Sequence, residues 1–179
     1  MTGDRARPTR VVEDPVEIDN PILAFFLAYW RDKREGGMLP RYANFALKEN
    51  KAHLSWVVVV EALPAYTDFR YRVVGTRVTQ YFLSDGTGKT VRQAFADMES
   101  NFVEGIVWLN RQACIERSPI RLTGPATVLN EIYFPDYDTI YLPYSSDGTT
   151  ADKVVNVFTF NHQKIHDRHT VPASPTQPL

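Results

Sequence analysis

The stretch Asp68-Phe69-Arg70-Tyr71-Arg72-Val73-Val74-Gly75-Thr76 decides the fold of this chain of 179 residues. Aromatic and β-branched residues alternate with arginine, which is the pattern of a strand with two unlike faces. Alternation places Phe69, Tyr71 and Val73 on one face, and Arg70, Arg72 and Val74 on the other. Gly75 ends the strand, and a segment of helical length follows it. We therefore predict a strand over residues 69–75 with one face toward a core or pocket.

The neighbouring segments predict the rest of the sheet. A β-branched run, Val57-Val58-Val59-Val60, indicates a strand over 54–62, and the turn residues at 64–68 join it to the next strand as a hairpin. Helices are predicted over 76–83, 91–96 and 99–117. Three strands follow over 120–129, 138–145 and 153–161, and Ser146-Asp147-Gly148 forms the turn between the last two. This order predicts an α+β fold with one five-stranded antiparallel sheet and helices on one face.

An amphipathic helix precedes the sheet. Asn20 and Pro21 suit its N-cap and first position, and Gly36-Gly37 ends it. One face carries a stripe of bulky aromatic residues: Phe25, Phe26, Tyr29 and Trp30. We place this helix outside the core. The stripe either packs on the chain's own sheet or pairs with a second copy, and we favour a symmetric homodimer with these four residues at its interface.

The chain divides into four segments. Residues 1–19 are polar and lack periodicity, so we expect a mobile N-terminal arm. Residues 20–53 form the amphipathic helix and a connector, and residues 54–162 form the core. Residues 163–179 are rich in proline and form a C-terminal tail.

Charge and cysteine content exclude several classes of protein. Twenty Lys and Arg residues nearly cancel 21 Asp and Glu residues, so general nucleic-acid binding has no electrostatic basis. A single cysteine, Cys114, rules out an intrachain disulfide and fits a reducing compartment. The longest apolar run, residues 21–30, is shorter than the roughly 20 residues that a membrane span needs. We expect a cytoplasmic protein without a membrane span.

Several short motifs resemble a known family in their order. They are Tyr29-Trp30-Arg31, Leu39-Pro40-Arg41, the stretch 68–76, Thr87-Gly88-Lys89, Leu142-Pro143-Tyr144-Ser145 and Asp147-Gly148. Together they resemble the PAS domain family, in the single-domain subclass found in alphaproteobacteria. The resemblance implies a sheet that cups a pocket, helices at its edge that mediate dimerisation, and a sensory or protein-interaction role. Because few residues remain for an output domain, we expect a regulator that acts through contacts with another signalling protein.

Other motifs give no support to a cofactor or a catalytic centre. Gly86-Thr87-Gly88-Lys89-Thr90 lacks the first glycine of a phosphate loop and is interpreted as a tight turn. His162, His166 and His169 would share a helical face as metal ligands do, but they are better explained as a polar tail. Cys114 lacks the Asn-Cys-Arg context of flavin-adduct photosensors, and the segment 76–117 contains no histidine for haem. We expect neither haem nor covalent flavin, and no metal; a cofactor of another kind stays unknown.

The remaining candidates are pocket residues. Arg70 and Arg72 could pair with an anionic ligand or with acids on a neighbouring strand, and we favour the second interpretation. We also place Tyr71, Trp108, Tyr141 and Asn156 at the pocket. The predicted function is a non-catalytic sensor in which a ligand shifts the population of dimer arrangements. Two alternatives stay open: a small α+β cone enzyme of the ketosteroid-isomerase type, and a scaffold without a ligand.

Overall fold

The computed structural model describes residues 7–10, 18–34, 36, 39–45, 51–82, 86–124, 127–129, 132–134 and 136–161. Its centre is a six-stranded sheet of order β1-β4-β7-β8-β2-β3, and every neighbouring pair is antiparallel. The strands are β1 (Arg7–Arg10), β2 (Val57–Ala62), β3 (Phe69–Val74), β4 (Ile120–Gly124), β7 (Asp136–Ser145) and β8 (Ala151–Asn161). A separate two-stranded ribbon joins β5 (Thr127–Leu129) to β6 (Ile132–Phe134). The predicted α+β class is confirmed, and each of the five predicted strands corresponds to a strand of this sheet, to which β1 adds a sixth.

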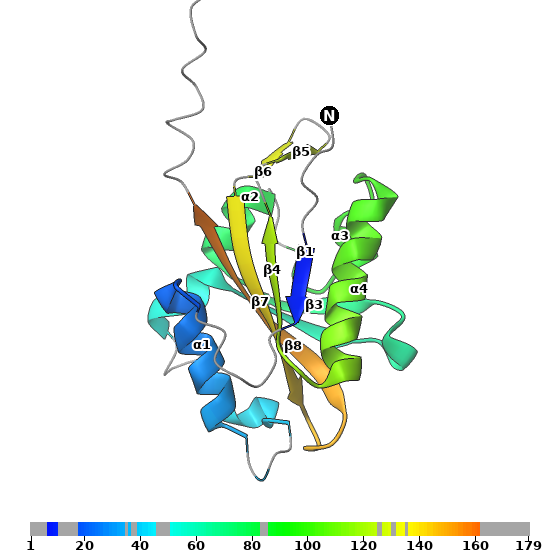
Figure 1. Cartoon of the computed structure of the whole chain (residues 1–179). Coiled ribbons are helices and arrows are strands. Elements are labelled where there is room, and N and C mark those ends of the chain that lie inside the picture. The colour runs from blue at the N-terminus through cyan, green and yellow to red at the C-terminus, as the bar shows by residue number, and fades with distance from the viewer. Residues whose placement is uncertain are drawn as a thin grey trace, which may run out of the picture.

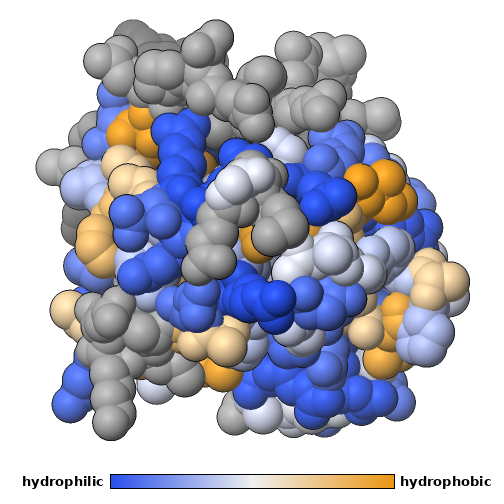
Figure 2. All heavy atoms as spheres, turned by 90° about the horizontal axis from the view of Figure 1, so that it is seen from below, coloured by the Kyte–Doolittle hydropathy of each residue, from blue (hydrophilic) through white to orange (hydrophobic). Residues whose placement is uncertain are grey.

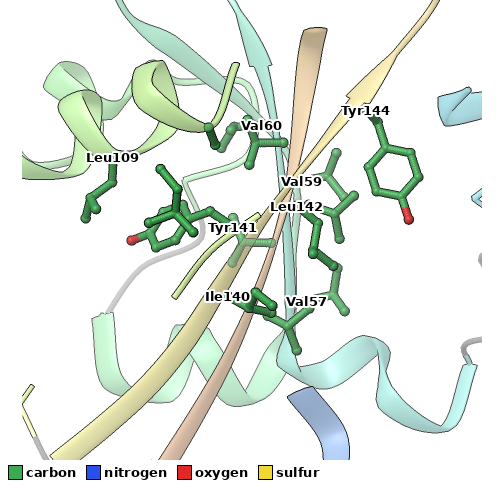
Figure 3. Packing of buried hydrophobic residues seen from close by; sticks show 14 of the residues in the cluster. Val57, Val59, Val60, Leu109, Ile140, Tyr141, Leu142 and Tyr144 are labelled. Atoms are coloured by element: carbon green, nitrogen blue, oxygen red, sulfur yellow. The ribbon is translucent and has the colours of Figure 1, made fainter. Parts of the chain in front are cut away.

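Helices cover both faces of this sheet (Figure 1). The shorter helices α2 (Thr76–Phe82) and α3 (Val91–Ala94) and the long helix α4 (Ser100–Glu116) lie over one face. Helix α1 (Pro21–Asp32) packs on the other face, against β7 and β8. Figure 3 shows the two sides of the core: Leu109 and Tyr141 lie on the α4 side, and Leu142 and Tyr144 lie on the α1 side.

Helix α1 belongs to the core, which corrects the prediction that it lies outside it. Its buried residues are Leu23, Phe26, Leu27 and Trp30. The helix begins as predicted, because the side chain of Asn20 accepts hydrogen bonds from the backbone N–H groups of Ile22 and Leu23 at 3.0 and 3.3 Å. Asn20 Nδ2 also donates to Thr159 Oγ1 of β8 at 3.0 Å, so the N-cap fixes the helix to the sheet.

Four of the short motifs meet at the β7–β8 hairpin on the α1 side. Trp30 Nε1 donates to the carbonyl oxygen of Pro143 at 2.6 Å. The backbone N–H of Ser145 donates to the carbonyl oxygen of Pro40 at 3.0 Å, and the Arg41 guanidinium covers Gly148, which has a φ of +90°. These motifs therefore hold α1 and the 39–45 segment against the hairpin.

The surface at the end of the molecule that carries the β7–β8 turn is largely hydrophilic, and its apolar side chains are scattered (Figure 2).

A bulge at Arg72 changes the faces of β3. The pairing of β3 with β2 shifts between Val59 and Val60, so that Arg72 has no partner residue on β2. The extra residue brings Val74 to the same side as Tyr71, where both line a cavity. The predicted alternation is wrong beyond Tyr71, because it assumed an unbroken two-residue repeat.

Two further elements were not predicted. Within the predicted N-terminal arm, β1 pairs with β4 at the edge of the sheet. The strand predicted over 120–129 ends earlier, at Gly124, and residues Thr127–Leu129 pair instead with β6. The four-segment division of the chain stays a prediction.

Candidate ligand-binding cavity

A small cavity lies between the sheet and helices α2, α3 and α4. Its volume is about 50 Å³. The lining side chains from the sheet are Val58, Tyr71, Val74, Tyr141, Asn156 and Phe158, and the opposite wall consists of Val78, Gly86, Ala94, Phe95 and Ile106. Most of these residues are apolar, as in ligand pockets that place a few polar groups in a hydrophobic wall.

The polar wall of the cavity centres on Asn156. This side chain is 2% exposed, and its Nδ2 donates to Asn110 Oδ1 of α4 at 3.1 Å. Asn110 is fully buried, and its Nδ2 donates to the carbonyl oxygen of Ile106 at 2.9 Å. Asn156 Oδ1 is buried and has no hydrogen-bond partner among the described residues. A buried acceptor without a partner costs free energy, so it marks a place where a bound molecule would be stabilised.

Two tyrosines complete the polar groups of the cavity. Desolvation by burial raises the pKa of Tyr71 and of Tyr141 well above the ordinary value, so both hydroxyls stay neutral at physiological pH. Each neutral hydroxyl can donate or accept a hydrogen bond. The cavity is therefore equipped to hydrogen-bond an uncharged molecule.

The turn at residues 86–90 holds Tyr71 in place. The backbone of Tyr71 donates to the carbonyl oxygen of Lys89 and accepts from the N–H of Gly88, both at 2.9 Å. A Cβ atom at Gly86 would lie 3.1 Å from the Tyr71 ring, so glycine lets the turn approach the ring closely. The Lys89 N–H donates to the carbonyl oxygen of Gly86 at 2.9 Å, and Thr90 caps α3. This geometry is that of the predicted tight turn.

The structure brings only half of the predicted pocket residues together. Tyr71, Tyr141 and Asn156 line the cavity. The predicted pocket position of Trp108 is wrong, because this side chain is 45% exposed on the outer side of α4. Whether a ligand contacts the first three residues stays a prediction.

The two arginines of β3 have partners away from the cavity. Arg70 Nη1 donates to the carbonyl oxygen of Gly88 at 2.7 Å. Arg72 forms an ion pair with Glu61 of β2, which also accepts from Lys153 Nζ of β8 at 3.2 Å. Arg72 thus pairs with an acid on a neighbouring strand, which is the interpretation that the sequence favoured. Neither arginine lines the cavity.

The aromatic stripe of α1 is split between the core and the surface. Phe26 and Trp30 are buried at 0% and 2% exposure, so they pack on the chain's own sheet. Phe25 is 41% exposed, and Tyr29 is half-buried. The predicted dimer interface of four residues is therefore wrong for Phe26 and Trp30, because both are already buried within one chain.

The other candidate motifs add no site. Cys114 is buried, and burial raises the pKa of its thiol to about 12, as expected for an inert core cysteine. The residues that the structure describes contain no group of three or more potential metal ligands. His162, His166 and His169 lie outside the described residues. No helix in the described part of the chain has the length and apolarity to cross a membrane.

Sequence reasoning missed Asn110, which orients the polar wall. Its position was visible in the sequence: it follows Ile106 by four residues in α4, and Leu109 and Ala113 flank it on the same apolar side. A polar residue among buried apolar neighbours of a helix indicates a buried hydrogen bond. Gly86 was noticed only as part of a phosphate-loop motif, and its contact with Tyr71 depends on tertiary structure.

The sheet, the helices over it and the cavity between them are typical of small α+β sensory domains. A family model described as "PAS domain" matches residues 18–155, which is most of the chain. The chain belongs to the PAS domain family. PAS domains are sensory and signalling modules, and the structure and family of this chain support such a role.

The comparison with solved structures finds a similar chain in an RNA-binding light-oxygen-voltage receptor. The two chains share 8% sequence identity at a TM-score of 0.46, and the match covers 90% of this chain. It covers only 40% of the receptor chain, and RNA binding is a property of that receptor. No curated protein matches this chain. The alphaproteobacterial single-domain subclass stays a prediction.

Proposed function

We propose that this PAS domain is a non-catalytic cytoplasmic sensor in which a small molecule in the cavity biases contacts with another signalling protein. The observation that supports this function best is the buried Asn156 Oδ1, which has no hydrogen-bond partner among the described residues and lies in a largely apolar cavity wall. Natural proteins rarely leave such an acceptor unsatisfied without a functional reason. A ligand that donates to it would stabilise the conformation in which the cavity is formed.

The position of α1 supports a route from ligand to partner. Cavity residues of β7 and β8 share these strands with residues that pack under α1 on the opposite face. A ligand with different affinities for two arrangements of the sheet and α1 would shift the population toward the arrangement that it binds more tightly. The proposed mechanism therefore needs no chemical step.

We propose that the exposed side of α1 forms a homodimer. This side carries Pro21, Phe25 and Ala28, with half-buried Tyr29 beside Phe25 at a ring-centroid distance of 6.3 Å. Aromatic residues are enriched in the centres of protein interfaces. The proposed interface is narrower than the aromatic stripe suggested, because Phe26 and Trp30 are buried in the core.

The enzyme alternative has less support than the sensor. An isomerase of the ketosteroid type needs a carboxylic acid or another base inside its apolar cavity. The lining residues that the structure describes include no Asp, Glu, His or Lys. A scaffold without a ligand stays the main alternative, since a few water molecules could also satisfy Asn156.

Native mass spectrometry of the chain, purified gently from its own host, tests this proposal. The expected spectrum shows two chains with a retained small molecule. Phe25→Glu should shift the spectrum to one chain, whereas Trp108→Glu, which places the same charge on exposed α4, should leave the dimer intact. A ligand-free monomer that also binds no molecule in a ligand screen would overturn the dimeric sensor.

A further inference from the structure

We propose that the cavity takes a small, uncharged, mainly apolar ligand whose hydroxyl or N–H group donates a hydrogen bond to Asn156 Oδ1. This inference rests on the proposed function, because it assumes that the cavity is the sensory site. It adds the chemical class of the ligand. Four properties of the cavity carry it: the direction of the hydrogen bonds in its wall, the two tyrosines, the absence of charge from the described lining, and the volume.

The direction of the hydrogen bonds is fixed by a backbone carbonyl. The carbonyl oxygen of Ile106 can only accept, so the Asn110 amide must present its Nδ2 to it. Asn110 Oδ1 then faces β8, and Asn156 must present its own Nδ2 to that oxygen. Oδ1, an acceptor, is the side-chain atom of Asn156 that has no hydrogen-bond partner among the described residues. Rotating either amide by half a turn would place two acceptors or two donors against each other.

A ligand that donates is therefore favoured over one that only accepts. A donor satisfies Asn156 Oδ1, whereas an acceptor-only ligand excludes water and leaves this oxygen unpaired in an apolar wall. The Tyr71 and Tyr141 hydroxyls do not change this preference. They can donate to the oxygen of either kind of ligand, so they do not distinguish between the two.

A charged ligand is disfavoured by the same wall. Eleven described residues line the cavity, and none of them carries a formal charge. The side chains of Arg70 and Arg72, which flank the lining residue Tyr71 in the chain, bind Gly88 and Glu61 away from the cavity. An anion in the cavity would lose its hydration without gaining a cationic partner from these residues.

The volume limits the ligand to a few atoms. A cavity needs roughly 10–15 Å³ to hold a single water molecule. The cavity of about 50 Å³ therefore has room for a molecule of a few non-hydrogen atoms without rearrangement of its walls. Larger ligands of the same class would have to displace part of a wall.

Three small probes of equal size test this class: isopropanol, acetone and acetate. Each has about four non-hydrogen atoms of similar arrangement, so that they differ mainly in hydrogen bonding and charge. We expect isopropanol, titrated into the full isotope-labelled chain, to shift the NMR signals of Asn156, Asn110 and Gly86 with saturation. Acetone should bind about tenfold more weakly, and acetate should leave these signals unchanged.

The variant Asn156→Leu keeps a side chain of similar size but lacks the acceptor. In this variant the preference for isopropanol over acetone should disappear, while both still enter the cavity. Because the single change leaves Asn110 Oδ1 unpaired, Asn110→Leu combined with Asn156→Leu provides a second variant without buried amides. The same loss of preference is expected there.

Three results would overturn this ligand class. They are binding of acetone or acetate as tight as that of isopropanol, a preference that survives in both variants, and no shift with any probe. The proposed function fails separately, when native mass spectrometry finds no retained molecule and a wider ligand screen finds no binding. A retained anion or a purely apolar ligand would remove the inference and keep the sensor.

Discussion

Trp30 and Pro143 are 113 residues apart, and the indole Nε1 of the first donates a buried hydrogen bond of 2.6 Å to the carbonyl oxygen of the second. The bond joins α1 to β7, two positions beyond the cavity residue Tyr141. It therefore connects α1 to a strand that also forms part of the cavity wall. Leu142, which lies between Tyr141 and Pro143 in β7, is fully buried on the α1 side (Figure 3).

Replacing Trp30 with Phe should destabilise the fold. The variant loses the hydrogen bond and leaves a void where the indole packed, which together cost about 2–3 kcal/mol of unfolding free energy. Urea unfolding measures the loss. Trp108→Phe serves as the control, because Trp108 is 45% exposed and its replacement should change the unfolding free energy by less than about 0.5 kcal/mol. Equal losses would contradict the proposed role of α1 in the core.

Gly75 should tolerate no side chain. A Cβ atom there would lie 2.6 Å from the carbonyl oxygen of Leu54 and closer still to that of Ser55, and neither backbone atom can move freely. We expect Gly75→Ala to cost about 3 kcal/mol or more, measured by thermal or urea unfolding.

Gly105 provides the matched glycine. It lies inside α4, and a Cβ atom there would meet nothing within 4 Å. Gly105→Ala should therefore stabilise the protein by about 0.5–1 kcal/mol through its helix propensity. A stabilising Gly75→Ala would show that the strand does not pass so close to the 54–55 backbone.

The Asn110–Asn156 pair should behave non-additively. Asn110→Leu alone leaves Asn156 Nδ2 buried without an acceptor, at a cost of about 1–3 kcal/mol. Adding Asn156→Leu removes the second amide, so the double variant should be more stable than the sum of the single changes predicts. A double-mutant cycle by urea unfolding measures the coupling, and strict additivity would contradict a direct hydrogen bond.

Asp147 should make the hairpin sensitive to acid. Its carboxylate accepts from the backbone N–H groups of Thr150 and Thr149 at 2.8 and 2.7 Å and from the Ser145 hydroxyl at 2.8 Å. These bonds hold the pKa of this carboxyl well below its usual range. A lowered folded-state pKa adds stability above the unfolded-state pKa of about 4 and loses it as the pH falls further.

The variant Asp147→Asn tests the sign of this effect. The amide cannot be protonated in this range, so stability should fall less steeply below about pH 4 than in the original chain. At neutral pH the variant should be less stable, because an amide oxygen is a weaker acceptor than a carboxylate. Thermal unfolding between pH 2 and pH 7 compares the two chains. Parallel curves would mean that Asp147 does not contribute to the acid response.

Local signals in the sequence predicted the elements of the fold well. Asn20-Pro21 marks the start of α1, and Ser146-Asp147-Gly148 marks the hairpin, because capping and turn chemistry depend on neighbouring residues. The short strand β1 gave no such signal. Its four residues, Arg-Pro-Thr-Arg, contain no apolar alternation, and they pair with a strand more than a hundred residues away.

The candidate site was less predictable because it depends on contacts between distant elements. Tyr71 and Asn156 could be placed at the cavity from the alternation of their strands. The bulge at Arg72 could not, since it appears only when β3 is paired with β2. The orientation of the Asn156 side-chain amide likewise depends on its hydrogen bond to Asn110, 46 residues earlier in the chain.

Residues of β8 contact the cavity on one face of the sheet and α1 on the other. Asn156 lines the cavity, while its chain neighbours Val155 and Val157 are fully buried toward the other face. They are joined to Asn156 by peptide bonds, so a displacement of the Asn156 backbone displaces them as well. In the proposed mechanism, a molecule in the cavity and a partner at α1 would act on opposite sides of the same strand. The signal would then cross the sheet through the main chain of β8.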